Sequence, residues 1–473
     1  MTRSTTGPLA GLLALALFGC TPPDAPTERY DVVLKGGRVI DPESGLDAVR
    51  NVGIRGDRIE TISESELAAE RVIDVSDHVV APGFIDLHVH GQSDEAFRLV
   101  VRDGVTTALE LEVGTEDVAG WYAAREAGQA VNYGVSIGHI RVRMEVMGDN
   151  GNFLPSGPGG HEPATDAQIA EMTSRIEQGL AEGAAAVGFG MAYTPAASIA
   201  EFEAMLRVAA AHGASSHIHV GAGLDGLRAA IEGASRTGAT LHVVHANSSG
   251  GASIAEFLAM IEEARATGQD VTAEMYPYEA GMTELESALF DDWGSWEDDE
   301  FAIYQWVRTG ERLTRDSFGR FRQEGGEVII HSRTPELTRI AIESPLTMIA
   351  SDGYIVDGMG HPRTSGTYSR VLGKYVREEG VLTLMEALRK MTIEPAQRLE
   401  SYVPAMADKG RLRAGADADI TVFDPDVVTD RSTYIDPSLP STGVAYVLVN
   451  GVLVVEGGEL VPEVRPGRAV RRH

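Results

Sequence analysis

Histidines and carboxylates stand at the ends of several short apolar runs in this chain of 473 residues. Imidazole nitrogens and carboxylate oxygens are the ligands that zinc and related divalent cations prefer. A catalytic metal needs such a ligand set together with an open position for water or substrate. The candidate ligands are, in chain order, His88, His90, Glu110, Glu112, His217, His219, His245 and Asp352.

Three pairs of these residues are spaced two apart, as in "GFIDLHVH", "ALELEV" and "SSHIHV". Residues two apart in a strand point to the same face, so each pair presents two ligands on one side. A single His-x-His pair usually lies on the surface or in the core and binds no metal. Four successive strands end in such ligands, at 88–90, 110–112, 217–219 and 245, and Asp352 ends the last strand; together these endings favour a metal centre.

Glu110 and Glu112 alternate with leucines in a segment that is otherwise typical of a buried strand. A buried carboxylate is costly unless a positive group meets it. That group is either the metal or an arginine, such as Arg141 or Arg143. His242 lies deeper in its run than His245, and we expect it to be a packed, hydrogen-bonded histidine rather than a ligand.

The strands and helices that must position these residues can be predicted from the pattern of apolar and helical segments along the chain. Short apolar runs alternate with Ala-rich helical segments such as 165–183 and 197–213. Alternating strands and helices are typical of parallel strands with crossover helices. The chain is therefore predicted to be an α/β protein whose residues 83–402 form a (β/α)₈ TIM barrel, with the active site at the C-terminal ends of the strands. The runs counted as strands include "EVIIHS" at 327–332.

Both ends of the chain have a different pattern. Residues 30–82 and 403–473 contain short alternating strands separated by turns, for example "YDVVLKGGRVID" and "VAYVLVNGVLVVEGG". We expect the two segments to form one small composite β-sandwich domain beside the barrel.

The first residues are typical of an export signal. Arg3 precedes an apolar run at 9–18, and "LFGC" ending at Cys20 resembles a bacterial lipobox. Residues 1–20 are therefore predicted to be a lipoprotein signal peptide and 21–29 a tether, so that the protein is exported and anchored in the cell envelope by a lipid on Cys20, facing the periplasm. An ordinary secretory signal with an incidental cysteine is the alternative. The only membrane contact expected is this lipid anchor.

The charge balance narrows the possible partners. The chain has 40 basic and 70 acidic residues, a formal net charge of −30, and no basic run that could follow a phosphate backbone. Nucleic acid is therefore excluded as an expected partner. Because Cys20 is the only cysteine, no intramolecular disulfide can form.

The segment "APGFIDLHVH", with the later histidines and "SDG", resembles the amidohydrolase superfamily. Narrower motifs are similar to the D-aminoacylase (N-acyl-D-amino-acid deacylase) group: "GVTT", "GHIRVRMEVMG", "MYPY", "HPRTSGTYSRVLGKYVRE", "EALRKMT" and "GADADITVFDP". The likeness extends from about Tyr30 to Gly457. It implies a barrel enzyme with one or two zinc ions.

Carried over residue by residue, the resemblance makes His88, His90 and Asp352 ligands of one metal position. It assigns His217 and His245 to the other position, with His219 as the alternative to His217. The group carries a cysteine ligand at the place of Val113, which cannot bind a metal. We therefore expect Glu112 to supply the anionic ligand, with Glu110 in reserve.

The resemblance also implies how a substrate would bind. Arg363 in "HPR" suits a free carboxylate, since a guanidinium can hold it with two hydrogen bonds. Tyr276 and Tyr278 are expected to assist it, and Tyr193 to line the pocket; packing under a loop is the alternative for these aromatics. The group commonly has a lysine where this chain has Asn247, so one cationic contact is missing.

The predicted function is metal-dependent hydrolysis of the linear amide of an N-acyl-D-amino acid. A metal-bound water would attack the carbonyl, and Asp352 would carry its proton to the departing nitrogen. The partner is a small molecule with a free carboxylate. The alternatives are a cyclic-amide hydrolase or dipeptidase of the same superfamily, and a binding lipoprotein that kept the fold without catalysis.

Overall fold

The computed structural model describes residues 1–5, 7 and 29–473. Cys20 and the apolar run before it lie outside the described residues. Within those residues, no helix has both the length and the hydropathy needed to cross a membrane.

Eight parallel strands form the central sheet, with the order β16-β12-β11-β10-β9-β8-β7-β6. A parallel bridge between Val89 and Gly353 joins the segments that follow the two outermost strands, so the sheet curls into a nearly closed barrel. This confirms the predicted fold class. The strands are β6 (Phe84–Asp86), β7 (Val105–Thr115), β8 (Asn132–Gly138), β9 (Val187–Gly190), β10 (Ser215–His219), β11 (Thr240–Val243), β12 (Val271–Met275) and β16 (Thr347–Ile349).

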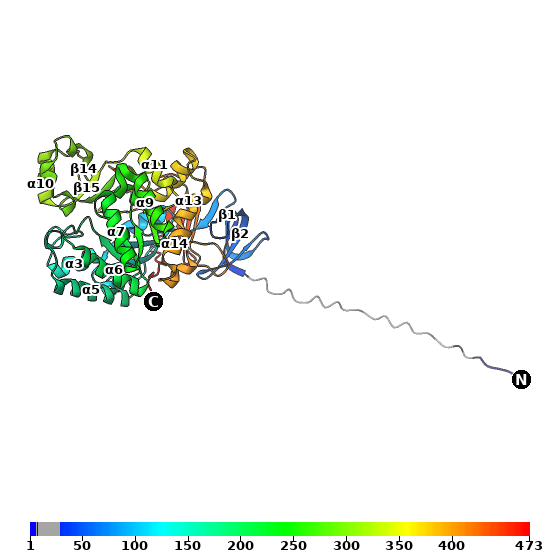
Figure 1. Cartoon of the computed structure of the whole chain (residues 1–473). Coiled ribbons are helices and arrows are strands. Elements are labelled where there is room, and N and C mark those ends of the chain that lie inside the picture. The colour runs from blue at the N-terminus through cyan, green and yellow to red at the C-terminus, as the bar shows by residue number, and fades with distance from the viewer. Residues whose placement is uncertain (6, 8–28) are drawn as a thin grey trace.

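Helices surround the barrel (Figure 1). Both helical segments expected from the sequence form, as α5 and α6. The first begins where Thr165 and Gln168 make a capping box that satisfies free backbone N–H groups. The helices outside the inserted lobe are α1 (Asp94–Arg102), α2 (Val118–Ala123), α3 (His139–Met147), α4 (Pro158–His161), α5 (Asp166–Ala181), α6 (Ile199–His212), α7 (Gly223–Thr237), α8 (Ala246–Gly250), α9 (Ile254–Ala266), α11 (Pro335–Glu343), α12 (Arg363–Arg370), which continues as a π-helix (Val371–Glu378), α13 (Leu384–Met391) and α14 (Ile393–Glu400).

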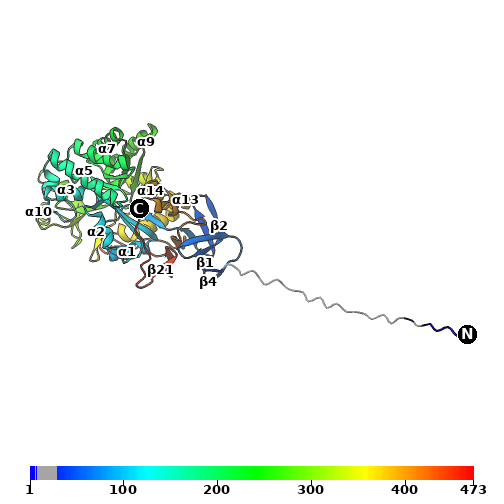
Figure 2. The same cartoon turned by 90° about the horizontal axis from the view of Figure 1, so that it is seen from below.

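A second sheet combines strands from both ends of the chain, as expected. Its order is β22-β21-β20-β19-β5-β1-β2-β3, and β4 pairs with β1. Seen from below, β21 lies near β1 and β4 (Figure 2). The strands are β1 (Arg29–Asp41), β2 (Leu46–Arg55), β3 (Arg58–Ser63), β4 (Ala68–Asp74), β5 (Val79–Pro82), β19 (Ile420–Phe423), β20 (Val444–Val449), β21 (Val452–Glu456) and β22 (Glu459–Leu460).

A lobe is inserted between β12 and α11. It contains a three-stranded antiparallel sheet of β13 (Gly281–Glu284), β15 (Glu327–Ile330) and β14 (Tyr304–Trp306), together with α10 (Arg315–Glu324). Aromatic side chains such as Trp306 and Phe318 form its own core. In Figure 1 it lies on the side of the barrel away from β1 and β2.

The assignment of "EVIIHS" to the barrel is wrong. This run forms β15 of the inserted lobe, where it pairs antiparallel with β13 and β14. A short apolar run has the same pattern in a barrel strand and in the central strand of a small antiparallel sheet, because both are covered on two sides.

Candidate metal centre and substrate cavity

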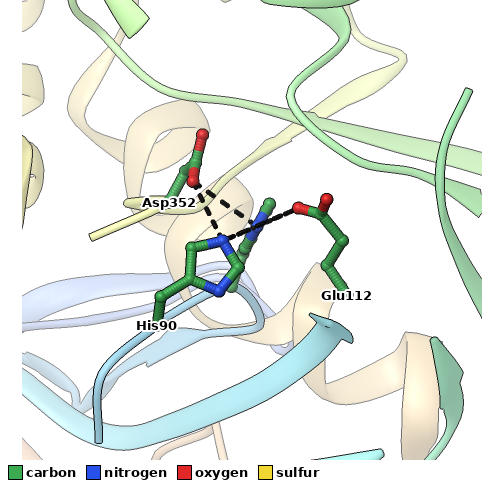
Figure 3. Close-up of side chains that lie close together, drawn as sticks. His90, Glu112 and Asp352 are labelled. Carbon is green, nitrogen blue, oxygen red and sulfur yellow. Dashed lines mark hydrogen bonds and ion pairs between the residues drawn. The ribbon is translucent and has the colours of Figure 1, made fainter. Parts of the chain in front are cut away.

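The first group of ligand atoms comes from three segments that are far apart in sequence. His88 and His90 directly follow β6, Glu112 lies in β7 and Asp352 follows β16. One ligand atom from each of the four lies within 4.8 Å of the others, and all four residues are buried. The Nε2 atom of His88 is 2.6 Å from Glu112 Oε2. Asp352 Oδ1 is 3.3 Å from His90 Nε2 (Figure 3).

A second group adjoins the first and shares Glu112 with it. It consists of Glu112, His219 and His245. Glu112 Oε1 is 3.0 Å from His219 Nδ1, and Glu112 Oε2 is 3.6 Å from His245 Nε2. His245 reaches this position because its backbone turns into the left-handed region directly after β11, with φ of 33°. One carboxylate between two imidazole groups is an arrangement that suits two neighbouring divalent cations.

Two carboxylates orient the histidines of the first group. Glu274 in β12 lies 2.5 Å from His88 Nδ1, and Glu110 lies 2.5 Å from His90 Nδ1. Each contact leaves the Nε2 atom directed at the cluster, as is common for metal-binding histidines. Sequence reasoning missed Glu274. The available signal was an acidic residue inside a buried apolar run, the same signal that drew attention to Glu110.

The negative charges of the buried carboxylates favour binding of a cation at this site. Burial favours the neutral imidazole of His90, but Glu110 and Asp352 outweigh it and raise the pKa of His90 to about 9. Burial opposes ionisation of Glu274 as well, yet the neighbouring His88 and His242 lower its pKa to about 2. The cluster thus attracts positive charge, and metal binding would displace the protons that the histidines otherwise hold.

Glu110 also shapes the end of β7. Its Oε1 accepts hydrogen bonds from the backbone N–H groups of Val113, at 3.1 Å, and Gly114, at 3.4 Å. The pairing between β7 and β8 is irregular over this stretch, and Gly114 has a φ of 66°. A Cβ on Gly114 would lie 2.6 Å from the carbonyl oxygen of Ser136, so only glycine fits. The bend leaves Glu112 facing the cluster.

The arginine explanation for the paired glutamates is wrong. Arg141 pairs with Glu116, and Arg143 pairs with Glu201. Glu110 instead contacts Nδ1 of His90, whereas Glu112 contacts Nε2 of His88. The two glutamates therefore occupy different positions relative to the cluster.

The choice of His217 over His219 is corrected by the geometry. His217 is fully buried one pleat deeper in β10, and neither of its ring nitrogens has a hydrogen-bond partner among the described residues. Its ring instead lies 4.5 Å from that of His242. His219, at the end of the strand, is the residue that joins the cluster. The expectation for His242 is confirmed, since its nitrogens contact Thr272 and Glu274.

A cavity of about 630 Å³ opens over the two candidate ligand groups. Tyr193, Tyr276 and Arg363 line it, as expected. The Tyr193 ring lies 4.6 Å from the ring of His219. Much of the remaining wall is apolar and comes from α6, the inserted lobe and adjacent loops: Leu154, Met191, Pro195, Ile199, Phe202, Met282, Leu289 and Ile330.

Tyr278 does not belong to this cavity, which corrects its assignment. Its hydroxyl lies 3.4 Å from both the Pro362 carbonyl and Asp430, and the guanidinium of Arg370 lies over its ring. Tyr278 therefore has the alternative role of packing under a loop. Asn247, at the position of the missing lysine, donates to the carbonyl of Tyr276 at 2.9 Å and so holds the backbone of that residue in place.

Arg363 connects the cavity to the ligand cluster. Its Nη1 atom lies 2.8 Å from Asp352 Oδ2, and its guanidinium lies over the Tyr276 ring, 4.6 Å from the centroid. Burial alone would raise the pKa of Asp352, but the charges of Arg363 and His88 hold it below its ordinary value. Asp352 therefore stays ionised, with one oxygen toward the histidines and the other toward Arg363.

Comparison with known proteins identifies the family. The amidohydrolase family model matches residues 144–455. The chain belongs to the amidohydrolase family. This amidohydrolase is 33% identical over 494 residues to an N-acyl-D-glutamate deacylase of Alcaligenes xylosoxydans xylosoxydans, with 94% of this chain and 97% of that protein covered. It is 32% identical over 486 residues to a D-aminoacylase of the same organism, with coverage of 90% and 95%.

Solved structures show the same relationship. The fold matches an N-acyl-D-glutamate deacylase from Bordetella bronchiseptica with a TM-score of 0.80 and 27% identity, covering 94% of this chain and all of that one. That protein was crystallised with zinc and a phosphonate inhibitor that mimics the tetrahedral intermediate of its reaction. The superfamily and the deacylase-like group expected from the sequence are confirmed.

Proposed function

We propose that this amidohydrolase hydrolyses the amide bond of N-acyl-D-amino acids with the help of zinc. The observation that carries the proposal is the pair of adjoining ligand groups that share Glu112 at the base of a cavity containing Arg363. The two deacylase relatives, aligned over at least nine-tenths of the chain, support the substrate class and the D configuration.

The donor set fits zinc. Imidazole nitrogens and carboxylate oxygens are its usual ligands, and Glu274 and Glu110 provide the outer hydrogen bonds that such histidines need. The proposed ligands are His88, His90, Glu112 and Asp352 for one ion and Glu112, His219 and His245 for a second. Bound zinc would lower the pKa of a water molecule and polarise the scissile carbonyl.

Side chains of the protein carry out proton transfer and substrate binding. Asp352 accepts the proton of the attacking water at Oδ1, the oxygen that faces the histidines, and delivers it to the departing nitrogen. Arg363 keeps Asp352 ionised and offers its guanidinium to the substrate carboxylate. The ring of Tyr276 packs against the guanidinium of Arg363, and Tyr193 borders the second ligand group.

A substrate screen tests the function. Zinc-loaded protein is expected to release amine from N-acetyl-D-amino acids and to lose this activity in a chelator, with recovery when zinc is returned. N-acetyl-L-amino acids, dipeptides and hydantoins serve as comparison substrates. Activity on hydantoins alone would replace the proposal by cyclic-amide hydrolysis. Silence on all four classes by protein that retains zinc would indicate a binding protein.

We propose further that the protein is exported and anchored by a lipid on Cys20, a residue outside the described part of the chain. The support is the pattern of the first 20 residues, a basic residue, an apolar run and "LFGC". Cells expressing the native protein are expected to incorporate labelled palmitate into it, and Cys20→Ala should abolish the label. Equal labelling, or none in either protein, would contradict the anchor.

A further inference from the structure

A second buried arginine faces the cavity. Arg333 follows β15 of the inserted lobe and precedes α11, and its backbone N–H donates to the Glu279 carbonyl at 3.1 Å. It lines the cavity, yet it is only 8% exposed. The segment 327–332, predicted as a barrel strand, thus leads into a residue of the cavity wall, but from the inserted lobe.

Arg333 has polar contacts but no counter-charge. Its Nη2 donates to the Tyr276 hydroxyl at 2.7 Å and to the Tyr278 carbonyl at 3.3 Å, and its Nη1 donates to the Ser248 hydroxyl at 3.2 Å. Its Nε has no hydrogen-bond partner, and no carboxylate of residues 29–473 forms an ion pair with it. Arg363, by contrast, is paired with Asp352.

A buried guanidinium without an anion is unfavourable, because neutral hydroxyl and carbonyl groups replace only part of its hydration. The charge is therefore suited to a ligand that brings an anion into the cavity. Arg333 and Arg363 both lie over the ring of Tyr276, 5.0 and 4.6 Å from its centroid, and both line the same cavity.

We propose that Arg333 is a carboxylate-binding residue that acts with Arg363 on the substrate, with the hydroxyls of Ser248 and Tyr276 completing the site. Arg333 takes the place of the cation that Asn247 cannot supply. The inference rests on the proposed function for its substrate. It adds a specificity determinant from the inserted lobe, so the lobe shares with Arg363 the preference for a free carboxylate.

The test compares N-acetyl-D-leucine with its C-terminal carboxamide, since the wall of the cavity is largely apolar. The native enzyme is expected to prefer the acid. Arg333→Gln should raise KM for the acid about 10- to 100-fold, the range for losing a hydrogen bond to a charged group, and leave the carboxamide nearly unchanged. Arg333→Lys keeps the charge and should retain part of the preference.

Arg308→Gln is the matched control. Arg308 belongs to the same lobe and lies over Trp306, but it is exposed and does not line the cavity. It should leave both substrates unaffected. An equal loss on acid and carboxamide in Arg333→Gln would show that Arg333 only supports Tyr276, and this would overturn the proposal.

Two further measurements keep the test independent of folding and of turnover. Ser248→Ala should raise KM for the acid alone, by less than Arg333→Gln. Calorimetric binding of N-acetyl-D-leucine should weaken in Arg333→Gln even if no protein hydrolyses it, which separates this proposal from the deacylase assignment. Equal affinity of native protein for the acid and the carboxamide would contradict it.

Discussion

Replacing Asp352 by asparagine is expected to lower kcat for amide hydrolysis by about 10³-fold, within the range that general acid–base groups contribute. The carboxylate is the group that stands between the histidines and Arg363, with Oδ1 3.3 Å from His90 Nε2 and Oδ2 2.8 Å from Arg363. Asparagine keeps the shape of the side chain but cannot accept a proton at this oxygen. Steady-state kinetics of the zinc-loaded variant measure the effect.

Asparagine is also the right replacement for the backbone. Asp352 has a φ of 52°, a left-handed conformation that Asp, Asn and Gly adopt more readily than other residues. Asp357 has a similar φ of 51° in an exposed position outside the cavity, so Asp357→Asn is the control and should retain full activity. Undiminished turnover in Asp352→Asn with zinc bound would refute the proton-transfer role.

Glu112→Gln is expected to lower the affinity for zinc by more than about 100-fold, beyond the usual cost of losing an outer partner of a metal site. Glu112 is the only residue common to both ligand groups among the described residues, so its loss weakens both positions. The neutral amide keeps the size of the side chain but removes the charge that offsets the cation. Zinc content after dialysis against buffered zinc gives the affinity.

Glu110→Gln is the matched comparison, two residues away on the same strand. Glu110 contacts Nδ1 of His90, which faces away from the cluster, and two backbone N–H groups, and it supplies no ligand atom itself. Its replacement should therefore cost about 10- to 100-fold in zinc affinity, less than that of Glu112. Full zinc occupancy in Glu112→Gln would exclude this residue as the anionic ligand, and a larger loss in Glu110→Gln would exchange the two roles.

The pattern of the chain was sufficient for the fold and for most of the ligand cluster. Residues that end parallel strands meet at one mouth of a barrel whatever the details of packing, so His88, His90, Glu112, His245 and Asp352 converge as expected. Strand alternation also placed Glu110 on the face of Glu112. These features depend on local periodicity, which can be read from one sequence.

The tertiary structure alone decided how deep each side chain lies and which groups it contacts. His217 and His219 have the same residue type and the same face, and only the folded barrel shows that His219, opposite Gly190 at the end of β9, is the one that meets Glu112. Likewise, Arg333 had no expected role and lines the cavity because the inserted lobe directs it there, whereas Tyr278, expected to assist Arg363, packs under a loop. Residue type and spacing specify what a side chain can do, whereas contacts between segments distant in sequence specify what it faces.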